Sequence, residues 1–526
     1  MKFLQGLLKE HILFVALLVV FILTPVAYFS YVPIWDGYQF VKLCYVPSSQ
    51  TLLLDCARHS APFNNLLFGF IQKIDIGNPL LIYTENIILG VIGLVFFYLL
   101  LKDVFGDLLT AYERALLTFL FGFHPVFLAH IVQPSLDYTL PIYLVVLLFF
   151  LLRNNYIWTA VSGLMLAFTK EPGIMVYGVS VFWYFYVFAG LGKRKELISG
   201  HLKEIWVLLI PFAAFALYAH FFTLQAHRDD GIFLEMFSFN TSHDFFVEQI
   251  ESIAIINFYW TVTVSILAGS AYFIYKNAKH RIDLEHITPI GLNTIYLSLC
   301  TVSVLWFNTR IEFFNNPRYM LLCVPLLVLS FTCVYAHFKG KILRVVMLSA
   351  LLSIIYLSAF RTFDPVSRYV FPTFRFGSHT MLKTPVSKTV LGVDYAGKDT
   401  LVYNFQFTEF DSLTEKAVRT FGLDKNYVMS RMFLGGSNGI FSDFDKRMQH
   451  RSLAGKSGNS EVVQVNILDD NQALGDKDLH DVYFIAMPAH YSEASMKNLL
   501  KSFVVTGATT IEDSGYSVDV IHLVRK

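Results

Sequence analysis

The sequence has few charged residues for its length. Only 15% of its 526 residues are Asp, Glu, Lys or Arg, whereas about a quarter of the residues in soluble domains are charged. In contrast, 55% of the residues are hydrophobic and 16% are aromatic. This shortage of charge excludes an ordinary soluble protein and predicts a polytopic α-helical membrane protein. The net charge of +1 predicts neither a nucleic-acid partner nor a strongly acidic one.

Cysteine is also scarce, and the five cysteines cannot build a full disulfide framework. Cys300, Cys323 and Cys333 lie in apolar runs, where we expect small buried side chains. Cys44 and Cys56 share one loop and are the one pair that a disulfide would join, although each would also serve as an apolar filler.

Several common motifs are missing as well. Residues 361–526 contain no Gly-rich phosphate loop, no metal-ligand spacing and no nucleophile motif. The chain has no internal repeat, which disfavours a transporter built from inverted repeats. We expect His124 and His130 to be packed or interfacial rather than metal ligands. We therefore predict no metal site and no certain cofactor, and a dependence on a divalent metal stays open.

Apolar runs of spanning length are frequent in the first 360 residues. About twenty such residues cross the roughly 30 Å of a bilayer's hydrocarbon. We predict about eleven spans, near residues 12–32, 79–101, 114–131, 136–152, 156–170, 172–190, 205–222, 251–275, 288–308, 318–337 and 343–360.

The distribution of basic residues sets the orientation of these spans. With the N-terminus in the cytoplasm, the inner segments hold fifteen Lys and Arg residues and the outer loops hold seven, as the positive-inside rule requires. An odd number of spans then places residues 361–526 outside the cytoplasm. We expect a multi-pass protein of the cell inner or plasma membrane.

The charge density roughly doubles after Phe360, which predicts a domain boundary there. Residues 1–360 hold 43 of the 81 charged side chains, and residues 361–526 hold the other 38. The tail alternates between strand-like and helix-like patterns, which predicts a soluble extracytoplasmic α/β domain. The expected strands cover residues 400–407, 482–487 and 518–524, and the expected helices cover 412–421 and 492–503.

Two outer loops are long. The first loop, residues 33–78, contains Asp36 directly after the first span and an apolar helical stripe over residues 63–74. That stripe is too short to span and predicts a helix lying along the membrane surface. The second loop, near residues 223–250, mixes charged and aromatic residues, and either folds over an outer cavity as a lid or rests on lipid.

The unusual ionisable residues of the membrane part gather on the outer side. Charge in or at a membrane is costly and tends to face a watery cavity. Such a cavity would suit an anionic substrate whose tail lies in lipid, because Lys and Arg hold a phosphate and a carboxylate accepts a proton. Some of these residues also have a simpler role: Lys170 and Glu171 as a local ion pair, Arg318 as an interface anchor, and Asp137 as the N-cap of its helix. The outer candidates are Asp36, Arg58, His59, Glu85, Asp137, Lys170, Glu171, Arg318 and Tyr319.

Five short motifs in the membrane part resemble the GT-C superfamily of membrane glycosyltransferases. The likeness is to the branch of protein O-mannosyltransferases and aminoarabinose transferases, and it covers roughly residues 1–340. The motifs are WDGY at Trp35–Tyr38, RHSAPF at Arg58–Phe63, HP at His124–Pro125 followed by PSLD at Pro134–Asp137, FTKEPG at Phe168–Gly173, and NPRY at Asn316–Tyr319. Many members have a second acidic residue after the first-loop Asp, where this chain has Gly37.

The resemblance implies an inverting transfer of a sugar from a polyprenyl-phosphate-linked donor to a lipid, glycan or protein acceptor on the outer face. By this resemblance Asp36 is the general base, Arg58, His59, Lys170 and Arg318 bind the donor phosphate, and Asp137 is a second catalytic or orienting carboxylate. Gly37 leaves open the metal dependence and the division of labour with Asp137. Glu85, Glu171 and Tyr319 are further substrate-binding candidates.

Other functions fit parts of the sequence. A polymerase or ligase of lipid-linked glycans would rely on Arg without an essential first-loop Asp. A transporter or flippase of a lipid-linked anion would need functional charges on both sides of the membrane. A scaffold or receptor with an outer sensory domain would leave the outer charges without a role.

Overall fold

The computed structural model describes two units of the chain, one helical and one mixed. The described residues are 2–25, 63, 67, 79–132, 135–191, 205–220, 259–278, 288–311, 317–336, 340–358, 375–376, 379–380, 413–414, 416–422, 424–429, 466–486, 490–513 and 516–526. Residues 359–374, which follow the last helix of the first unit, lie outside these ranges, and each unit is described by itself.

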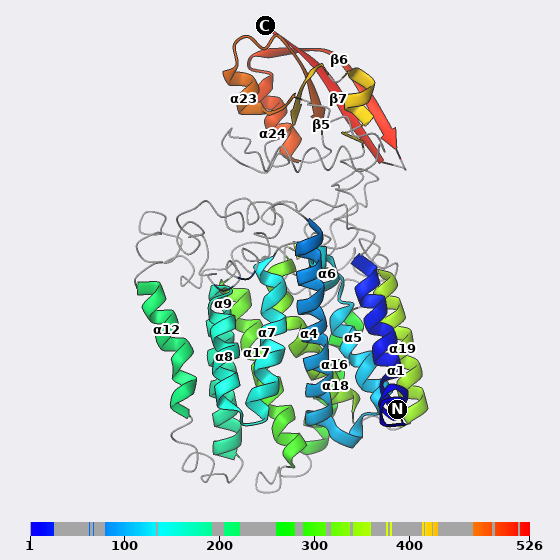
Figure 1. Cartoon of the computed structure of the whole chain (residues 1–526), viewed down its shortest axis with the longest axis vertical. Coiled ribbons are helices and arrows are strands. Elements are labelled where there is room, and N and C mark those ends of the chain that lie inside the picture. Colours follow the sequence, from blue (N-terminus) through cyan, green and yellow to red (C-terminus); the bar gives the residue numbers. More distant parts are fainter. Residues whose placement is uncertain are drawn as a thin grey trace.

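The first unit is a bundle of helices (Figure 1). Every one of the eleven predicted apolar runs contains helix, so the helical class expected for residues 1–360 is confirmed. The longer helices are α1 (Lys2–Leu23), α4 (Pro79–Phe105), α5 (Ala111–Gly122), α7 (Leu136–Leu152), α8 (Tyr156–Ala167), α9 (Glu171–Phe185), α12 (Ile210–Tyr218), α16 (Tyr259–Ala278), α17 (Pro289–Ile311), α18 (Val324–Tyr335) and α19 (Lys341–Ser358). Shorter turns are η3 (Gly106–Leu108), α6 (Pro125–Ala129), η4 (His130–Val132), η5 (Tyr186–Leu191), η6 (Trp206–Leu209) and η9 (Pro317–Cys323).

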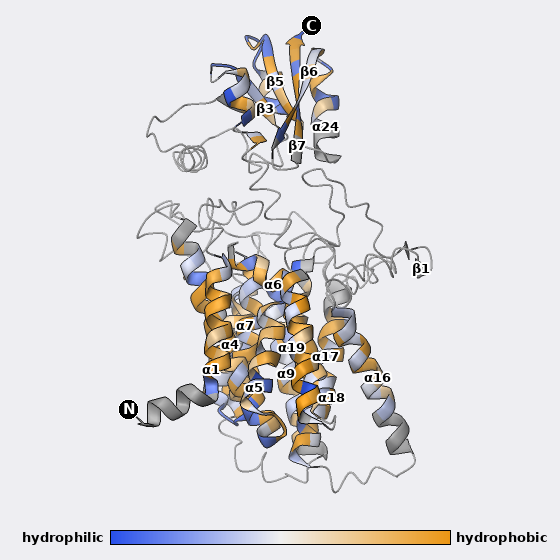
Figure 2. Cartoon of the chain, turned by 90° about the vertical axis from the view of Figure 1, so that its right-hand side faces the viewer, coloured by the Kyte–Doolittle hydropathy of each residue, from blue (hydrophilic) through white to orange (hydrophobic). Residues whose placement is uncertain are grey.

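The helices of the bundle are apolar over most of their surface, as the hydropathy colours of Figure 2 show. Within the described residues, two helical stretches are long and apolar enough to cross a bilayer, Tyr83–Leu108 and Pro289–Phe307. Six shorter helical stretches are also apolar. Large side chains such as Trp206 and Ile342, 68% and 84% exposed, point away from the bundle, as side chains that face lipid do. The number of spans stays a prediction.

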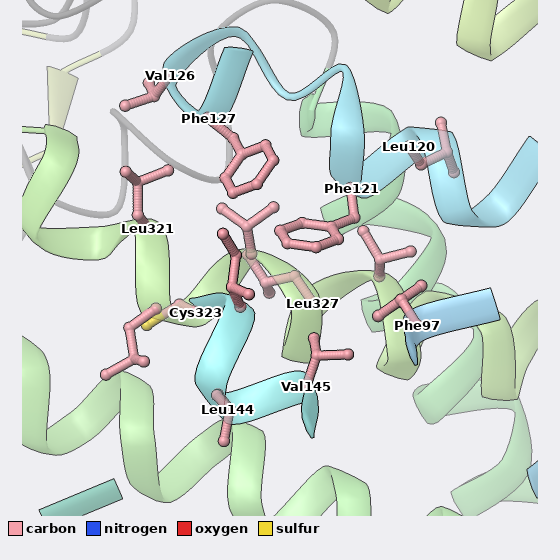
Figure 3. Close-up of a cluster of buried hydrophobic side chains, with 14 of the residues drawn as sticks. Phe97, Leu120, Phe121, Val126, Phe127, Leu144, Val145, Leu321, Cys323 and Leu327 are labelled. Atoms are coloured by element: carbon pink, nitrogen blue, oxygen red, sulfur yellow. The ribbon is translucent and has the colours of Figure 1, made fainter. Parts of the chain in front are cut away.

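Helix α7 lies at the centre of the bundle between α4 and α8 (Figure 1). Its side chains are buried along nearly its whole length. Figure 3 shows how its middle section packs against the neighbouring helices. The cluster combines Phe97 of α4, Leu120 and Phe121 of α5, Val126 and Phe127 of α6, Leu144 and Val145 of α7, Leu321 and Cys323 of η9, and Leu327 of α18.

Helices α4 and α7 approach closely because Gly90 has no side chain. A Cβ atom there would lie 2.4 Å from the Tyr138 hydroxyl oxygen. The same hydroxyl donates a hydrogen bond of 2.9 Å to the carbonyl of Asn86, and the Asn86 amide donates one of 2.9 Å to the carbonyl of Ile131. These bonds fix the beginning of α7 relative to α4, because buried polar groups strongly favour satisfied partners.

At the other end of the bundle, Glu113 joins three helices. Its carboxylate closes a capping box with Thr110 at the start of α5, accepts a 3.0 Å hydrogen bond from the Tyr335 hydroxyl and lies 2.8 Å from the Arg344 guanidinium. These contacts are buried or half-buried. Glu113 and Arg344 are therefore paired with each other and clamp α5, α18 and α19 together.

The second unit is a small α/β domain around a five-stranded sheet. The strands are β3 (Asn426–Met429), β4 (Asn466–Asp469), β5 (Asp481–Ala486), β6 (Phe503–Asp513) and β7 (Tyr516–Arg525), in the order β4-β3-β5-β7-β6. Strand β3 pairs in parallel with β4 and β5, whereas β7 pairs antiparallel with β5 and β6. A separate short hairpin joins β1 (Arg375–Phe376) to β2 (His379–Thr380).

Helices cover both faces of this sheet. Val482 and Phe484 of β5 pack with Leu499 at the end of α24 (His490–Leu499) and with Ala473 of α23 (Asp470–Gly475). The alternate β5 residues face the opposite side, where the Tyr483 ring contacts Phe421 at the end of the helical residues 413–421. This alternation is the two-residue period of a strand buried on both faces.

The predicted tail elements are only partly correct. The helix of residues 413–421 and strands β5 and β7 lie where they are expected. The helix predicted over 492–503 ends at Leu499, because Phe503 already begins β6. Strands β3, β4 and β6 are not in the prediction, and the predicted strand 400–407 lies outside the described residues.

Several other predictions also fall outside the described ranges. These are the lid of residues 223–250, the Cys44–Cys56 pair and most of the surface helix, of which Phe63 and Leu67 are described, both as helical. Cys300, Cys323 and Cys333 are buried, as expected of small core residues.

Candidate functional site

Three of the predicted residues meet at one end of the bundle. The Lys170 Nζ atom donates a 2.8 Å hydrogen bond to Asp137 Oδ1, and Arg318 Nε lies 3.7 Å from Asp137 Oδ2. The side chains are 9% exposed for Asp137, 6% for Lys170 and 15% for Arg318. Lys170 and Arg318, which follow Asp137 by 33 and 181 residues, thus place two cations against the two oxygens of its carboxylate.

Asp137 is in the first turn of α7, and Ser135 is the residue that caps this helix. The Ser135 hydroxyl accepts a 3.3 Å hydrogen bond from the Asp137 amide. The alternative in which Asp137 itself caps the helix is therefore wrong. Because Ser135 supplies the cap, the Asp137 carboxylate remains available for the two cations.

Lys170 lies at the break between α8 and α9. Its backbone is extended, with φ −164° and ψ 154°, and it forms the N-cap position of α9, whose first turn contains Pro172. Proline is favoured there because it has no amide hydrogen to donate and its φ suits a helix. Thr169 closes the end of α8 by donating a 2.6 Å hydrogen bond to the Met165 carbonyl. The Lys170 ammonium contacts Asp137, so this lysine has a partner on another helix, and a local ion pair with Glu171 stays a prediction.

Gly173 explains how α8 and α9 meet tightly enough to hold Lys170 in place. A Cβ atom on Gly173 would lie 2.0 Å from the Leu166 carbonyl oxygen and 2.5 Å from the Leu166 carbonyl carbon. Both neighbours are backbone atoms, which cannot rotate aside as a flexible side chain can. In the TKEPG turn, Gly173 therefore permits the close approach of α8 and α9, and this approach positions Lys170.

Arg318 reaches the site from the first turn of η9, which continues directly into α18. Three helical segments thus begin at the same place: α7, α9 and the η9–α18 run. The amide groups at the beginning of a helix carry partial positive charge. Together with Lys170 and Arg318, these termini make the end of the bundle a place where an anion is stabilised.

Burial makes this arrangement energetically demanding. Ions removed from water lose solvation, and only close, well-oriented partners compensate for that loss. Asp137 is the acidic partner that compensates both cations, so the three side chains depend on one another for their positions. The described part of the cluster has two positive charges and one negative charge.

Glu85 lies on α4, with 4% of its surface exposed. Neither of its carboxyl oxygens has a hydrogen-bond partner among the described residues. The Tyr143 hydroxyl of α7 lies within electrostatic reach of this carboxyl group and likewise has no hydrogen-bond partner in the described part of the chain. Tyr143 is the residue that the sequence reasoning missed, because a tyrosine inside an apolar run carries no distinguishing signal.

Phe63 connects the first outer loop to both features. Its amide donates a 3.1 Å hydrogen bond to the carbonyl of Phe168, two residues before Lys170. Its ring lies edge-on to that of Tyr143, with the centroids 5.7 Å apart. Phe63 therefore contacts both the turn that holds Lys170 and the Tyr143 ring.

The remaining predicted residues are placed less fully. Glu171 is half-buried in the first turn of α9, and Tyr319 follows Arg318 in the backbone of η9. Asp36, Arg58 and His59 lie outside the described residues, so their proximity to the cluster stays a prediction. His124 and His130 are buried, and the His124 ring packs against that of Tyr259. No group of three or more metal-ligating side chains occurs among the described residues.

The chain matches no protein-family model and no curated protein sequence. It is similar in structure to ArnT from Cupriavidus metallidurans in complex with undecaprenyl phosphate, with a TM-score of 0.49 and 12% sequence identity. That similarity covers 98% of this chain and 98% of the ArnT chain. The apo state of the same ArnT gives a TM-score of 0.48 and 12% identity over 97% of each chain. An identity of 12% transfers no residue's role from ArnT to this chain.

Proposed function

We propose that this chain is an integral membrane glycosyltransferase that moves a sugar from a polyprenyl-phosphate donor to an acceptor on the outer face of the membrane. The observation that carries the proposal is the buried meeting of Lys170 and Arg318 on Asp137, where three helical segments begin. Two cations and three helix termini at the end of an apolar bundle suit an anionic headgroup whose lipid tail stays in the bilayer.

In the proposed reaction, the acceptor hydroxyl attacks the anomeric carbon of the donor sugar from the face opposite the phosphate. The bond between the anomeric carbon and the phosphate oxygen breaks, and the oxygen leaves with the electron pair. Negative charge on the phosphate grows during this step, so fixed cations lower the barrier. Lys170 and Arg318 supply these charges, and the reaction inverts the configuration at the anomeric carbon.

Asp36 is the proposed general base that takes the proton from the acceptor hydroxyl. Asp137 is assigned a different role, because both of its oxygens already contact cations. It holds Lys170 and Arg318 at the positions in which they receive the phosphate. The two carboxylates therefore divide the work between proton transfer and positioning.

Arg58 and His59 are proposed to approach the same phosphate. Phe63 is bonded to Phe168, which precedes Lys170 by two residues. Arg58 precedes Phe63 by five residues, and this short separation supports the proposal. Glu171 and Tyr319 adjoin the two cations in sequence and are proposed to contact the substrate.

The proposed topology places the N-terminus in the cytoplasm and the C-terminal domain outside it. The donor lipid and the surrounding membrane are the expected partners, and nucleic acid is not. A transporter of a lipid-linked anion is less well supported, because the buried Glu113 and Arg344 at the opposite end of the bundle are committed to a structural clamp.

The test is transfer from a polyprenyl-phosphate sugar by the purified full-length chain, with donor binding measured separately. Asp36→Asn has nearly the same shape but cannot accept the proton, so it should reduce turnover by about 10²–10⁴-fold while donor binding persists. Asp137→Asn should reduce turnover less. Near-normal turnover by Asp36→Asn would overturn the mechanism.

The phosphate assignment has its own test. Lys170→Ala and Arg318→Ala should each weaken donor binding strongly. Arg318→Lys should restore only part of it, because an ammonium group is a point charge and lacks the planar fork of a guanidinium. Normal donor use by both alanine variants would mean that these residues are structural anchors.

A further inference from the structure

The Glu85–Tyr143 pair is an unusual feature of the bundle interior. A carboxyl group and a phenol are both buried, with 4% and 2% of their surfaces exposed. None of their three oxygen atoms has a hydrogen-bond partner in the described part of the chain. Buried polar atoms without partners are rare because their lost hydration is not replaced. Such a pair is therefore either a defect or half of a binding site.

The position of the pair indicates what it binds. Tyr143 follows Asp137 by six residues, which is about 9 Å along α7. Phe63 bridges the two places, because its ring contacts Tyr143 and its amide is bonded to Phe168 beside the Lys170 turn. Tyr143 and the Lys170 turn therefore both contact Phe63, which places the pair beside the phosphate cluster.

The hydrogen-bonding groups of the pair narrow the chemical class of the ligand further. A buried carboxyl group accepts hydrogen bonds at its oxygens and donates one when it is protonated, and a phenol both donates and accepts. A sugar presents several adjacent hydroxyl groups, each of which also donates and accepts. An ammonium group has donors alone, so it could not accept a hydrogen bond from either side chain.

We infer that Glu85 and Tyr143 form a subsite for the hydroxyl groups of the donor's glycosyl residue. The inference rests on the proposed function, because it assumes that a phosphate occupies the Asp137–Lys170–Arg318 cluster. It assigns recognition of the sugar to α4 and α7 and recognition of the phosphate to the cluster. The two contributions to donor affinity are therefore separable by substitution.

The experiment compares undecaprenyl phosphate with undecaprenyl-phosphate-linked glucose, mannose and xylose on the purified full-length chain. For the wild type, at least one sugar-bearing lipid should bind about ten-fold more tightly than the bare lipid, which is the combined effect of hydrogen bonds to two buried polar groups. Glu85→Gln and Tyr143→Phe should remove most of this gain and leave affinity for the bare lipid within about two-fold.

Tyr138→Phe is the matched control on the same helix. Its hydroxyl already donates to the Asn86 carbonyl, so its loss should lower the Tm of the free protein and leave the sugar-dependent gain intact. Glu85→Met should do the reverse: it removes unpartnered buried oxygens, so it should raise the Tm of the free protein while abolishing the gain. A purely structural Glu85 would instead lower the Tm when replaced.

The outcomes separate the two proposals. If bare undecaprenyl phosphate does not bind the wild type, the proposed function fails. If the bare lipid binds but no attached sugar improves affinity, or if Glu85→Gln and Tyr143→Phe keep the full gain, the subsite is refuted while the phosphate site stands. A subsite filled only by water gives this second result, because neither substitution would then affect lipid binding.

Discussion

The ion pair between Lys170 and Asp137 allows stability and function to be measured separately. The pair is 2.8 Å long and nearly inaccessible to solvent. Lys170→Met keeps most of the side-chain volume but leaves Asp137 with Arg318 alone, at 3.7 Å. Removing one partner of a buried pair costs about 3–5 kcal/mol, because the other charge remains buried without full compensation. We therefore expect Lys170→Met to lower the free energy of unfolding by about that amount.

The double variant Asp137→Asn with Lys170→Met should recover most of this loss. It removes both buried charges, and neutral replacements of buried pairs are often no less stable than the original. The coupling between the two substitutions should therefore be at least as large as the recovered loss, about 3 kcal/mol or more, at the upper end of the range for contacting residues. Chemical unfolding in detergent, followed by circular dichroism, measures the four proteins of this cycle.

Donor binding should not recover together with stability. The double variant has lost one of the two cations and the carboxylate that positions the other, so its affinity for undecaprenyl phosphate should stay as low as that of Lys170→Met. A double variant that regains both stability and lipid affinity would refute the phosphate-binding role. Arg153→Ala is the control, because its ion pair with Asp103 is exposed, lies about 24 Å along α7 from Asp137 and should contribute less than about 1 kcal/mol.

Three other predictions address the elements around the site. Gly173→Ala should destabilise the protein by about 1–3 kcal/mol and weaken donor binding, because a Cβ there would lie 2.0 Å from the Leu166 carbonyl oxygen. Gly178→Ala on the same helix is the control: its Cβ would have contacts of 3.4 Å, so it should be tolerated in the same unfolding and binding assays. Glu113→Gln should cost about 3–5 kcal/mol through Arg344, and lipid affinity per folded molecule should remain normal. Burial raises the pKa of Tyr427 to about 12. The stability that its neutral phenol contributes is therefore present below about pH 10 and is lost as the pH approaches 12. Tyr427→Phe should reduce this alkaline loss of C-terminal-domain stability, monitored by circular dichroism.

Local patterns accounted for the elements whose signals are periodic. The apolar runs form helices because an α-helix satisfies its backbone hydrogen bonds within the segment, as an apolar surrounding requires. Strands β5 and β7 carry alternating or β-branched residues and lie where the pattern places them. Strand β6 has a similar β-branched sequence, FVVTGATTIED, yet its beginning was assigned to the preceding helix. The pairing with β7 over ten positions decides its conformation, and that pairing is a tertiary contact.

Asp137, Lys170 and Arg318 are recognisable from the residue pattern alone as polar residues at the ends of apolar helices. Their meeting depends on the packing of the bundle, which brings α7, the α8–α9 turn and η9 together. The Ser135 cap of α7 and the backbone contact at Gly173 likewise depend on the folded geometry, because shifts of a few tenths of an ångström would remove either one. Tyr143 likewise became a candidate through its surroundings in the folded protein. A tyrosine in an apolar run becomes a candidate ligand only when its neighbour is a buried carboxyl group on another helix.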